Sequence, residues 1–333
     1  TERFRPTFSR FAGRALRRSF PQLEGLLRPA GRPQQDPGPL HRGSQRSPGS
    51  GGSDGRTQWP TGCPGHRRGP RFDVALTPNG YAWWYIDAFS DDGRNSLTAI
   101  IFLGSVFSPT YARERRRRTS VDPLEFPAIN LMLRGRDGQA WVMSEHPAHR
   151  VERGPEQLVI GSSEVSWQGD GLVCRIDERT TPWPGALRGT IRVYPEAFNR
   201  RACALDEFDR HRWWPIAPVA RVEVELDEPA HRWSGHGYLD SNWGDEPLEN
   251  AFSGWSWSRS AVGEHVCVHY VTDALGGTRR ALALDFDRTG DGRDRSVGDI
   301  YALPKTGGGI AREVVADPDS SPQVVEELLD TPF

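Results

Sequence analysis

Lysine is nearly missing from this chain, whose 333 residues include one lysine, Lys305, beside 41 arginines. Long apolar runs are missing as well, since no stretch approaches the roughly 18 consecutive apolar residues of a membrane-spanning helix. The four cysteines, Cys63, Cys174, Cys203 and Cys267, form no C-x-x-C pair. This excludes zinc ribbons and thioredoxin-like motifs and predicts reduced thiols. No G-x-G-x-x-G or P-loop motif occurs, so no nucleotide cofactor is indicated.

The small net charge of -2 conceals a division along the chain. Residues 1–70 contain 13 arginines against four acidic residues, so residues 71–333 carry a net charge of -11. Nucleic-acid-binding surfaces are basic and normally use lysine as well as arginine. Because the remainder is acidic and almost free of lysine, no nucleic-acid partner is predicted.

Residues 1–70 have the composition of a tail. Proline, glycine, serine and arginine dominate, and such a segment buries too little apolar surface to offset the entropy lost on ordering. We therefore predict a disordered N-terminal tail. Within it, residues 14–27 have the pattern of a short basic amphipathic helix, which would suit contact with a membrane surface.

From Arg71 onward the sequence is typical of β-strands. Aromatic and β-branched runs occupy residues 81–87 and 97–107, and apolar residues alternate with polar ones at 222–226 and 265–271. Clusters of glycine, proline, asparagine and aspartate separate these runs. Many short strands at this spacing predict an all-β fold, either a barrel or a sandwich.

A weak internal repeat favours two structural units. The sequence YID at residues 85–87 follows a glycine and an aromatic run, and YLD at residues 238–240 follows two glycines. The simplest interpretation is two tandem antiparallel β-barrels, one over 71–210 and one over 211–333. The closing strands of the second barrel are expected to lie beyond Phe333.

Tryptophan is concentrated in one region. Seven of the 12 tryptophans fall between Trp183 and Trp257, interleaved with histidine and aspartate. Indole rings suit flat apolar ligands and cations, although core packing also uses them. The cluster favours a ligand site.

The segment HGYLDSNWG at residues 236–244 is the most distinctive. On a strand, Tyr238, Asp240 and Asn242 point to one face. If that face meets an aromatic interior, burial raises the pKa of Asp240 and allows it to serve as a general acid, with Tyr238 fixing its orientation. The alternative is an ionised, structural aspartate bonded to turn amides.

The segment HRWWP begins at His211, which shares a strand face with Trp213. A histidine there is suited to activating water, because its ordinary pKa is close to neutral. The alternative is a histidine that serves only packing.

His265, Cys267 and His269 share another strand face. The pattern resembles a stripe of metal ligands, and a metal enzyme built on it is one alternative. No further ligands accompany the three residues, so we predict no metal site.

Four segments resemble the carotenoid 1,2-hydratase family, also called hydroxyneurosporene synthase. The resemblance runs from about Arg71 to Phe333. It is carried by GYAWWYIDAFSDDG at 80–93, IIFLGSVFSPTYA at 100–112, HRWWP at 211–215 and GHGYLDSNWGDEP at 235–247. No segment of residues 1–70 contributes to this resemblance.

The resemblance implies two lipocalin-like barrels and hydration of the terminal C1–C2 double bond of acyclic carotenoids such as neurosporene and lycopene. The product is a 1-hydroxy-1,2-dihydro carotenoid on the route to spheroidene or spirilloxanthin in phototrophic bacteria. No organic cofactor is implied. Because the substrate resides in lipid, we expect a cytoplasmic protein peripherally associated with the intracytoplasmic membrane, with the basic tail and the RERRRR run at 113–118 as contacts.

The strand-face pattern and the family resemblance together suggest roles for individual residues. Asp240 is the expected acid, and Asp87 holds the corresponding place in the first repeat. Trp213, Tyr238 and Trp243 are expected to stabilise a cation, and His211 to orient or deprotonate the water. The predicted catalytic residues are Asp240, His211, Tyr238 and Trp213, and the predicted substrate-binding residues are Trp243, Trp214, Asn242 and Asp87.

Two other classes of function fit a lipocalin-like shape. A carrier would bind a long apolar isoprenoid without converting it, and a related cyclase or isomerase would form a cation without adding water. The carrier has no need of a protonated carboxyl group facing its ligand, so Asp240 distinguishes it from the enzymes.

Overall fold

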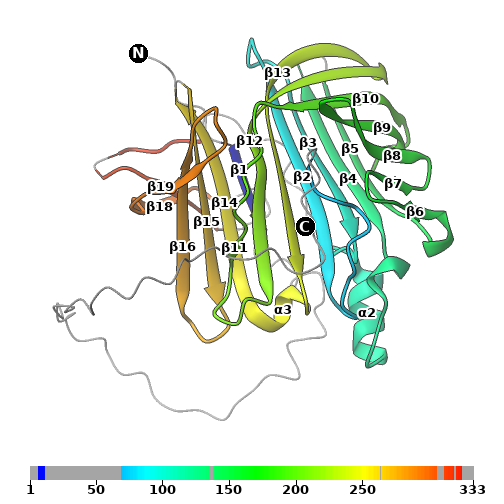
Figure 1. The fold of residues 1–333 in the computed structure, drawn as a ribbon, viewed down its shortest axis with the longest axis horizontal. Coiled ribbons are helices and arrows are strands. Elements are labelled where there is room, and N and C mark those ends of the chain that lie inside the picture. Colours follow the sequence, from blue (N-terminus) through cyan, green and yellow to red (C-terminus); the bar gives the residue numbers. More distant parts are fainter. Residues whose placement is uncertain are drawn as a thin grey trace.

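The computed structural model describes residues 7–11, 69–135, 138–262, 264–305, 311–318 and 320–324, and most of them lie in β-strands (Figure 1). The predicted tail and its helix at 14–27 lie outside the described residues, apart from strand β1 (Thr7–Phe11) and residues 69–70. In the described ranges, no helix has both the length and the apolar character needed to span a bilayer.

The larger of the two main sheets has 12 strands and is antiparallel throughout. Its order is β5-β4-β3-β2-β13-β12-β10-β9-β8-β7-β6, and β11 pairs with β12. The strands are β2 (Tyr81–Ser90), β3 (Ser96–Leu103), β4 (Ala128–Gly135), β5 (Gly138–Glu145), β6 (Val151–Arg153), β7 (Gln157–Ile160), β8 (Ser163–Gln168), β9 (Gly171–Arg179), β10 (Ala186–Pro195), β11 (Cys203–Ala204), β12 (His211–Glu228) and β13 (Ala230–Gly244).

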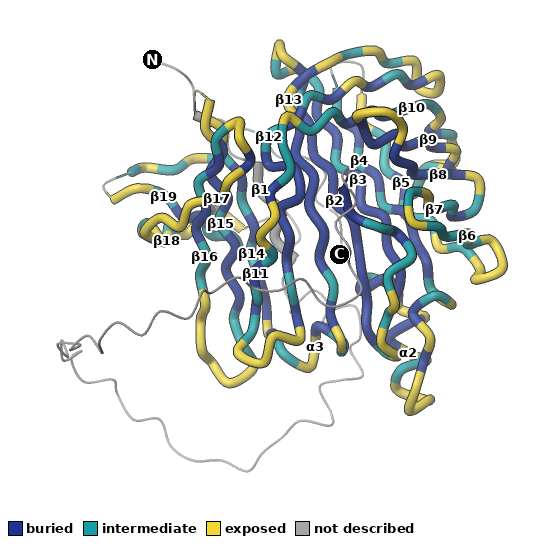
Figure 2. Tube along the Cα trace, in the orientation of Figure 1, coloured by how far each residue is buried: buried dark blue, intermediate teal, exposed yellow. Residues whose placement is uncertain are grey.

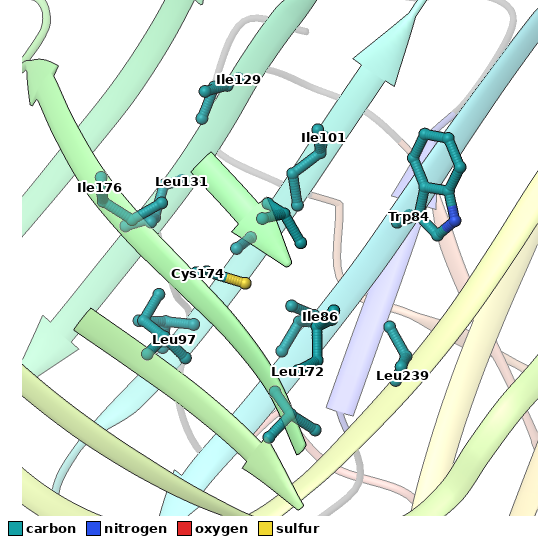
Figure 3. Close-up of a cluster of buried hydrophobic side chains, with 14 of the residues drawn as sticks. Trp84, Ile86, Leu97, Ile101, Ile129, Leu131, Leu172, Cys174, Ile176 and Leu239 are labelled. Carbon is teal, nitrogen blue, oxygen red and sulfur yellow. The ribbon is translucent and has the colours of Figure 1, made fainter. Parts of the chain in front are cut away.

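This sheet curls around a dry core. Its β5 side approaches the end of β9, where the Thr181 amide donates to the Trp141 carbonyl at 2.8 Å. Side chains from both halves of the curl meet inside, as Figure 3 shows for ten labelled residues. They are Trp84, Ile86, Leu97, Ile101, Ile129, Leu131, Leu172, Cys174, Ile176 and Leu239. The described side chains inside the curled sheet therefore form one hydrophobic core.

A second sheet packs on the outer face of β2 and β13 (Figure 1). Its order is β1-β14-β15-β16-β17, and a hairpin of β18 and β19 accompanies it. The strands are β14 (Phe252–Val262), β15 (His265–Ala274), β16 (Arg279–Phe286), β17 (Gly292–Asp294), β18 (Asp299–Leu303) and β19 (Arg312–Ala316). The helices are short: α2 (Pro109–Arg117), α3 (Leu248–Ala251), and the 3-10 turns η2 (Pro123–Glu125) and η3 (Ala148–Arg150).

Strands β2 and β13 are buried on both faces where the two sheets meet (Figure 2). Along β2, Trp84 and Ile86 face the dry core, while Tyr81, Trp83 and Tyr85 face the second sheet. A strand covered on both faces reads as a continuous apolar run, which explains why YAWWYID shows no polar alternation.

The predicted all-β, lipocalin-like class is confirmed by the curled antiparallel sheet. The expected division at residue 210 does not coincide with a sheet boundary, because β12 and β13 are central strands of the larger sheet. The two repeated triads are cross-strand neighbours: Tyr238 opposes Asp87, and Asp240 opposes Tyr85. The repeat therefore marks one shared wall of the structure.

Candidate active site

A pocket opens between the two sheets, on the outer face of β2, β3 and β13. Eight of its ten lining residues are apolar or aromatic, and its cavity volume is about 30 Å³. The lining residues are Trp83, Tyr85, Ile100, Phe102, Phe107, Asp240, Asn242, Trp255, Trp257 and Tyr270. A concave apolar site with a few convergent polar groups is typical of small-molecule binding.

Asp240 is the acidic residue of this pocket. It lies on β13 and is 3% exposed. Its Oδ2 accepts hydrogen bonds from Trp213 Nε1 at 2.8 Å and from the Tyr238 hydroxyl at 3.0 Å. Its Oδ1 is buried and accepts no hydrogen bond from any described residue. Two hydrogen bonds thus fix the carboxyl group through Oδ2, while Oδ1 has no hydrogen-bond partner among the described residues.

Burial raises the pKa of Asp240 from 3.8 to about 8. The hydrogen bonds from Trp213 and Tyr238 oppose this shift, and the charge of nearby Asp87 adds to it. The upward direction agrees with the prediction, and a pKa of about 8 favours the protonated carboxyl group at neutral pH. Since both donors occupy Oδ2, the acidic proton belongs on Oδ1, the oxygen without a partner.

Asp87 stands beside this group but has a different partner. It is 1% exposed on β2 and forms a buried ion pair with Arg259 of β14, whose guanidinium also lies 5.6 Å from the ring centre of Tyr238. Burial raises the pKa of Asp87, and contact with Arg259 opposes that shift. No cationic side chain of the described residues pairs with Asp240, which makes it the better proton donor of the two.

Replacing Arg259 with methionine is expected to cost about 3–5 kcal/mol of unfolding free energy, because it leaves the Asp87 carboxylate buried without its counter-ion. The double variant Arg259→Met/Asp87→Leu is expected to recover most of this loss. The control is Arg188→Met, which breaks half-exposed pairs with Asp177 and Glu228. That control is expected to leave the urea unfolding midpoint essentially unchanged, because exposed ion pairs contribute little to stability. An Arg259→Met protein as stable as the wild type would contradict the role of the pair.

His211 does not line the pocket, because the ring of Tyr81 lies between it and the pocket residue Trp83. Its Nδ1 is 2.8 Å from the Tyr81 hydroxyl, and Tyr81 stacks on the pocket residue Trp83 with ring centres 5.0 Å apart. Burial lowers the pKa of His211, so the ring is neutral at pH 7. Its Nε2 has no hydrogen-bond partner among the described residues, and Glu246 Oε1 lies 3.7 Å away.

Gly244 makes room for this pair of rings. A Cβ atom there would lie 2.5 Å from Tyr81 Cε1 and 2.7 Å from His211 Nδ1. Gly244→Ala is therefore expected to push the two rings apart and to cost about 1–3 kcal/mol in unfolding free energy. Gly276→Ala is the matched control, because no atom lies within 4 Å of its added Cβ. Equal stability of the two alanine variants in urea would show that the rings are not held as described.

The other predicted residues divide between the two faces of the sheet. Asn242 lines the pocket, and Trp213 contacts Asp240 from the same side. Trp214 faces the dry core and donates through Nε1 to the Asn199 carbonyl at 2.7 Å. Trp243 also packs against that core, so neither lines the pocket. Their predicted contact with substrate stays a prediction.

Comparison with known proteins matches residues 99–333 to the family model described as carotenoid hydratase CrtC. The match spans well over half of the chain and includes the whole of β12, β13, β14 and β15. The chain belongs to the carotenoid hydratase CrtC family. The expectation of an enzyme of the hydro-lyase class is thereby confirmed.

Several relatives of this carotenoid hydratase family member are named acyclic carotenoid 1,2-hydratase. The acyclic carotenoid 1,2-hydratase of Thiocapsa roseopersicina is 46% identical over 96% of this chain and 78% of its own length. That of Rubrivivax gelatinosus is 42% identical over 79% of this chain and 66% of its own length. Among solved structures, a Nitrosomonas europaea protein assigned as AttH superposes with a TM-score of 0.47 at 14% identity, covering 69% of this chain and 74% of that one.

In this hydratase family member, sequence reasoning missed the contribution of the second sheet to the pocket. Trp255 and Trp257 of β14 and Tyr270 of β15 all line it. The available signal was the alternation of β15, in which Val266, Val268 and Tyr270 form one buried face. The sequence analysis singled out the opposite face instead.

That opposite face of β15 carries the suggested metal stripe. Cys267 Sγ lies 3.8 Å from His269 Nε2, whereas His265 Nδ1 lies 3.2 Å from Asp285. Across the described parts of the chain, no group of three or more histidine, cysteine or acidic side chains is arranged to hold a metal ion.

Proposed function

We propose that this enzyme adds water to the terminal C1–C2 double bond of acyclic carotenoids such as neurosporene and lycopene. The product would be a 1-hydroxy-1,2-dihydro carotenoid, an intermediate for spheroidene or spirilloxanthin. The observation that carries the proposal is the buried Asp240 carboxyl group, with one oxygen unpartnered among the described residues, in the wall of an aromatic pocket. Burial also raises its pKa to about 8. The names of the relatives support the substrate class.

Protonation is the difficult step for an isolated trisubstituted alkene. Asp240 would donate the proton on Oδ1 to C2, which leaves the positive charge on C1, the more substituted carbon. Trp213 and Tyr238 stabilise the developing carboxylate, since both donate to Oδ2 and strengthen those bonds as negative charge builds up. Donor positions that are fixed before the reaction cost no reorganisation during it.

The tertiary cation would form among ring faces. Trp83, Trp255 and Trp257 line the pocket and present π-systems to a positive charge. Each contact contributes about 0.5–2 kcal/mol, so the acid and its positioning must supply most of the rate enhancement. The newly formed Asp240 carboxylate adds a counter-charge at short range.

Water then attacks C1 and gives up a proton. The Asp240 carboxylate is suited to accept that proton, which restores the acid for the next cycle. The predicted role of His211 towards the water stays a prediction, since the residue lies behind Tyr81 rather than in the pocket wall. Its contacts support an indirect role, in which it fixes Tyr81 and, through it, Trp83.

Peripheral membrane association is part of the proposal, because the substrate resides in the bilayer. Helix α2 begins two residues after the pocket residue Phe107. It exposes Arg113 and Arg117, which both pair with Glu114, while Arg115 pairs with Glu249 of α3. Exposed arginines on a helix close in sequence to a pocket residue suit contact with anionic lipid head groups.

The test is product analysis after incubation of the enzyme with lycopene or neurosporene in detergent. The proposal expects a product heavier than its substrate by one water, with the hydroxyl group on C1. Recovery of unchanged but tightly bound carotenoid would favour a carrier. A product of unchanged mass with a moved double bond or a new ring would favour an isomerase or a cyclase.

A further inference from the structure

Tyr270 enters the pocket from the second sheet. It lies on β15 and is 4% exposed, and its hydroxyl oxygen accepts a hydrogen bond from Asn242 Nδ2 of β13 at 3.1 Å. Asn242 is itself 2% exposed. The Tyr270 ring also lies 5.3 Å from that of Trp213, the donor to Asp240. The ring thus comes from the second sheet, and its hydroxyl group is fixed within the pocket wall beside Asn242 of the larger sheet.

Three polar atoms in this aromatic pocket retain unused hydrogen-bonding capacity. Among the described residues, none accepts the Tyr270 O–H proton, and none pairs with Asp240 Oδ1 or Trp257 Nε1. Buried polar groups normally have partners, and an internal water needs two to four of them. These atoms therefore favour a water molecule as part of the bound state.

We propose that Tyr270, held in place by Asn242, positions the water that attacks C1. The inference rests on the proposed hydration. Asp240 and Asn242 are alternate residues on one face of β13, so their side chains leave the strand about 7 Å apart. A two-carbon double bond fits into that interval, with C2 towards Asp240 and C1 towards the Tyr270 hydroxyl.

The atoms balance without any further reactant. The Asp240 Oδ1–H bond breaks and a C2–H bond forms, leaving the cation at C1. The oxygen of the water held by Tyr270 bonds to C1 while one of its O–H bonds breaks, and that proton goes to the Asp240 carboxylate. The net reaction is alkene plus water to tertiary alcohol, and the enzyme ends as it began.

Loss of the positioned water has a specific consequence, because the cation still forms. A tertiary cation without a nucleophile loses a proton, either from C2 to return the substrate or from an adjacent methyl group to give an isomeric alkene. Removing the Tyr270 hydroxyl group should therefore change the fate of the cation more than its formation. A merely structural role for Tyr270 would reduce both together.

The experiment follows lycopene in D₂O with the wild type and with Tyr270→Phe. The variant is expected to lose about 100-fold in alcohol formation, as for a reactant misplaced by about 1 Å. It should still place deuterium on C2 of recovered or isomerised alkene. Asn242→Leu is expected to shift the ratio of alkene to alcohol in the same direction. Tyr111→Phe is the matched control, since its buried hydroxyl donates to the Gly80 carbonyl outside the pocket.

The outcomes separate this inference from the proposed function. If the wild type makes alcohol and Tyr270→Phe keeps the wild-type ratio of alkene to alcohol, Tyr270 does not position the water. A folded variant that loses alcohol formation and deuterium incorporation equally also overturns the inference. If the wild type itself makes no alcohol, the proposed function has failed. A raised ratio in Tyr270→Phe but not in Tyr111→Phe supports the inference.

Discussion

Asp240→Asn is expected to abolish hydration of lycopene, with a loss of about 10⁴-fold or more, the upper range for removal of a general acid. Asparagine keeps the shape of the side chain but supplies no acidic proton. No other acidic side chain lines the described pocket. The measurement is the yield of alcohol by chromatography and mass spectrometry, together with incorporation of deuterium at C2 in D₂O. Both signals should vanish.

The variant must be shown to fold, and the structure predicts that it does. Folding the wild type at pH 7 requires protonation of a carboxyl group that is ionised in the unfolded chain, because burial raises its pKa to about 8. Asparagine removes that cost, so the variant should be no less stable at pH 7. Equal activity of wild type and variant would remove Asp240 as the acid. Attention would then pass to Asp87, tested by the corresponding Asp87→Asn protein.

The rate of hydration is expected to fall as the pH rises through about 8, the pKa of Asp240. Only the protonated form can donate, so activity stays level below this pH and drops about tenfold for each pH unit well above it. Burial is the main cause of the raised pKa, with Asp87 adding to it and Trp213 and Tyr238 opposing it. The measurement is the initial rate at saturating substrate between pH 6 and pH 10, values chosen to bracket that pKa.

Trp213→Phe provides the check on this assignment. It removes the indole N–H that donates to Asp240 Oδ2 and favours the carboxylate. The alkaline fall in activity should therefore move to higher pH. A fall that stays at the same pH in this variant, or a rate that rises with pH in the wild type, would show that Asp240 does not act as the protonated acid.

Alternation along a single strand predicted the acid and its immediate surroundings. The period-two rule placed Tyr238, Asp240 and Asn242 on one face of β13, and the structure has them there. The same rule separates Trp243 from that face and Trp214 from Trp213. Trp214 and Trp243 are nevertheless predicted to bind substrate, because the whole tryptophan cluster is interpreted as one site. Successive residues of a strand point to opposite faces of the sheet.

The internal repeat did not indicate how its two copies lie relative to each other. Similar triads at residues 85–87 and 238–240 suggested two separate units, but they lie side by side on β2 and β13. Sequence similarity records neither which strands pair nor which sheet they join. Asp87 differs from Asp240 because it forms an ion pair with Arg259, which lies on a strand of the second sheet. No local sequence pattern indicates that pairing.

The second sheet was the least predictable part of the site. In β15 both faces carry plausible residues, with Tyr270 on one face and Cys267 and His269 on the other. Which face closes the pocket depends on how the second sheet packs against β2 and β13, a long-range arrangement without a signature along the strand. Tyr270 therefore became visible only in three dimensions.

Infrared spectroscopy of the enzyme tests directly whether the Asp240 carboxyl group is protonated. A neutral carboxylic acid has a carbonyl stretching band that a carboxylate lacks, and subtraction of the Asp240→Asn spectrum isolates the contribution of this residue. We expect such a band at pH 7 and its disappearance as the pH rises through about 8, the pKa of Asp240. A difference spectrum at pH 7 that shows only carboxylate bands would mean that Asp240 is an ionised structural residue, and the proposed proton transfer would be wrong.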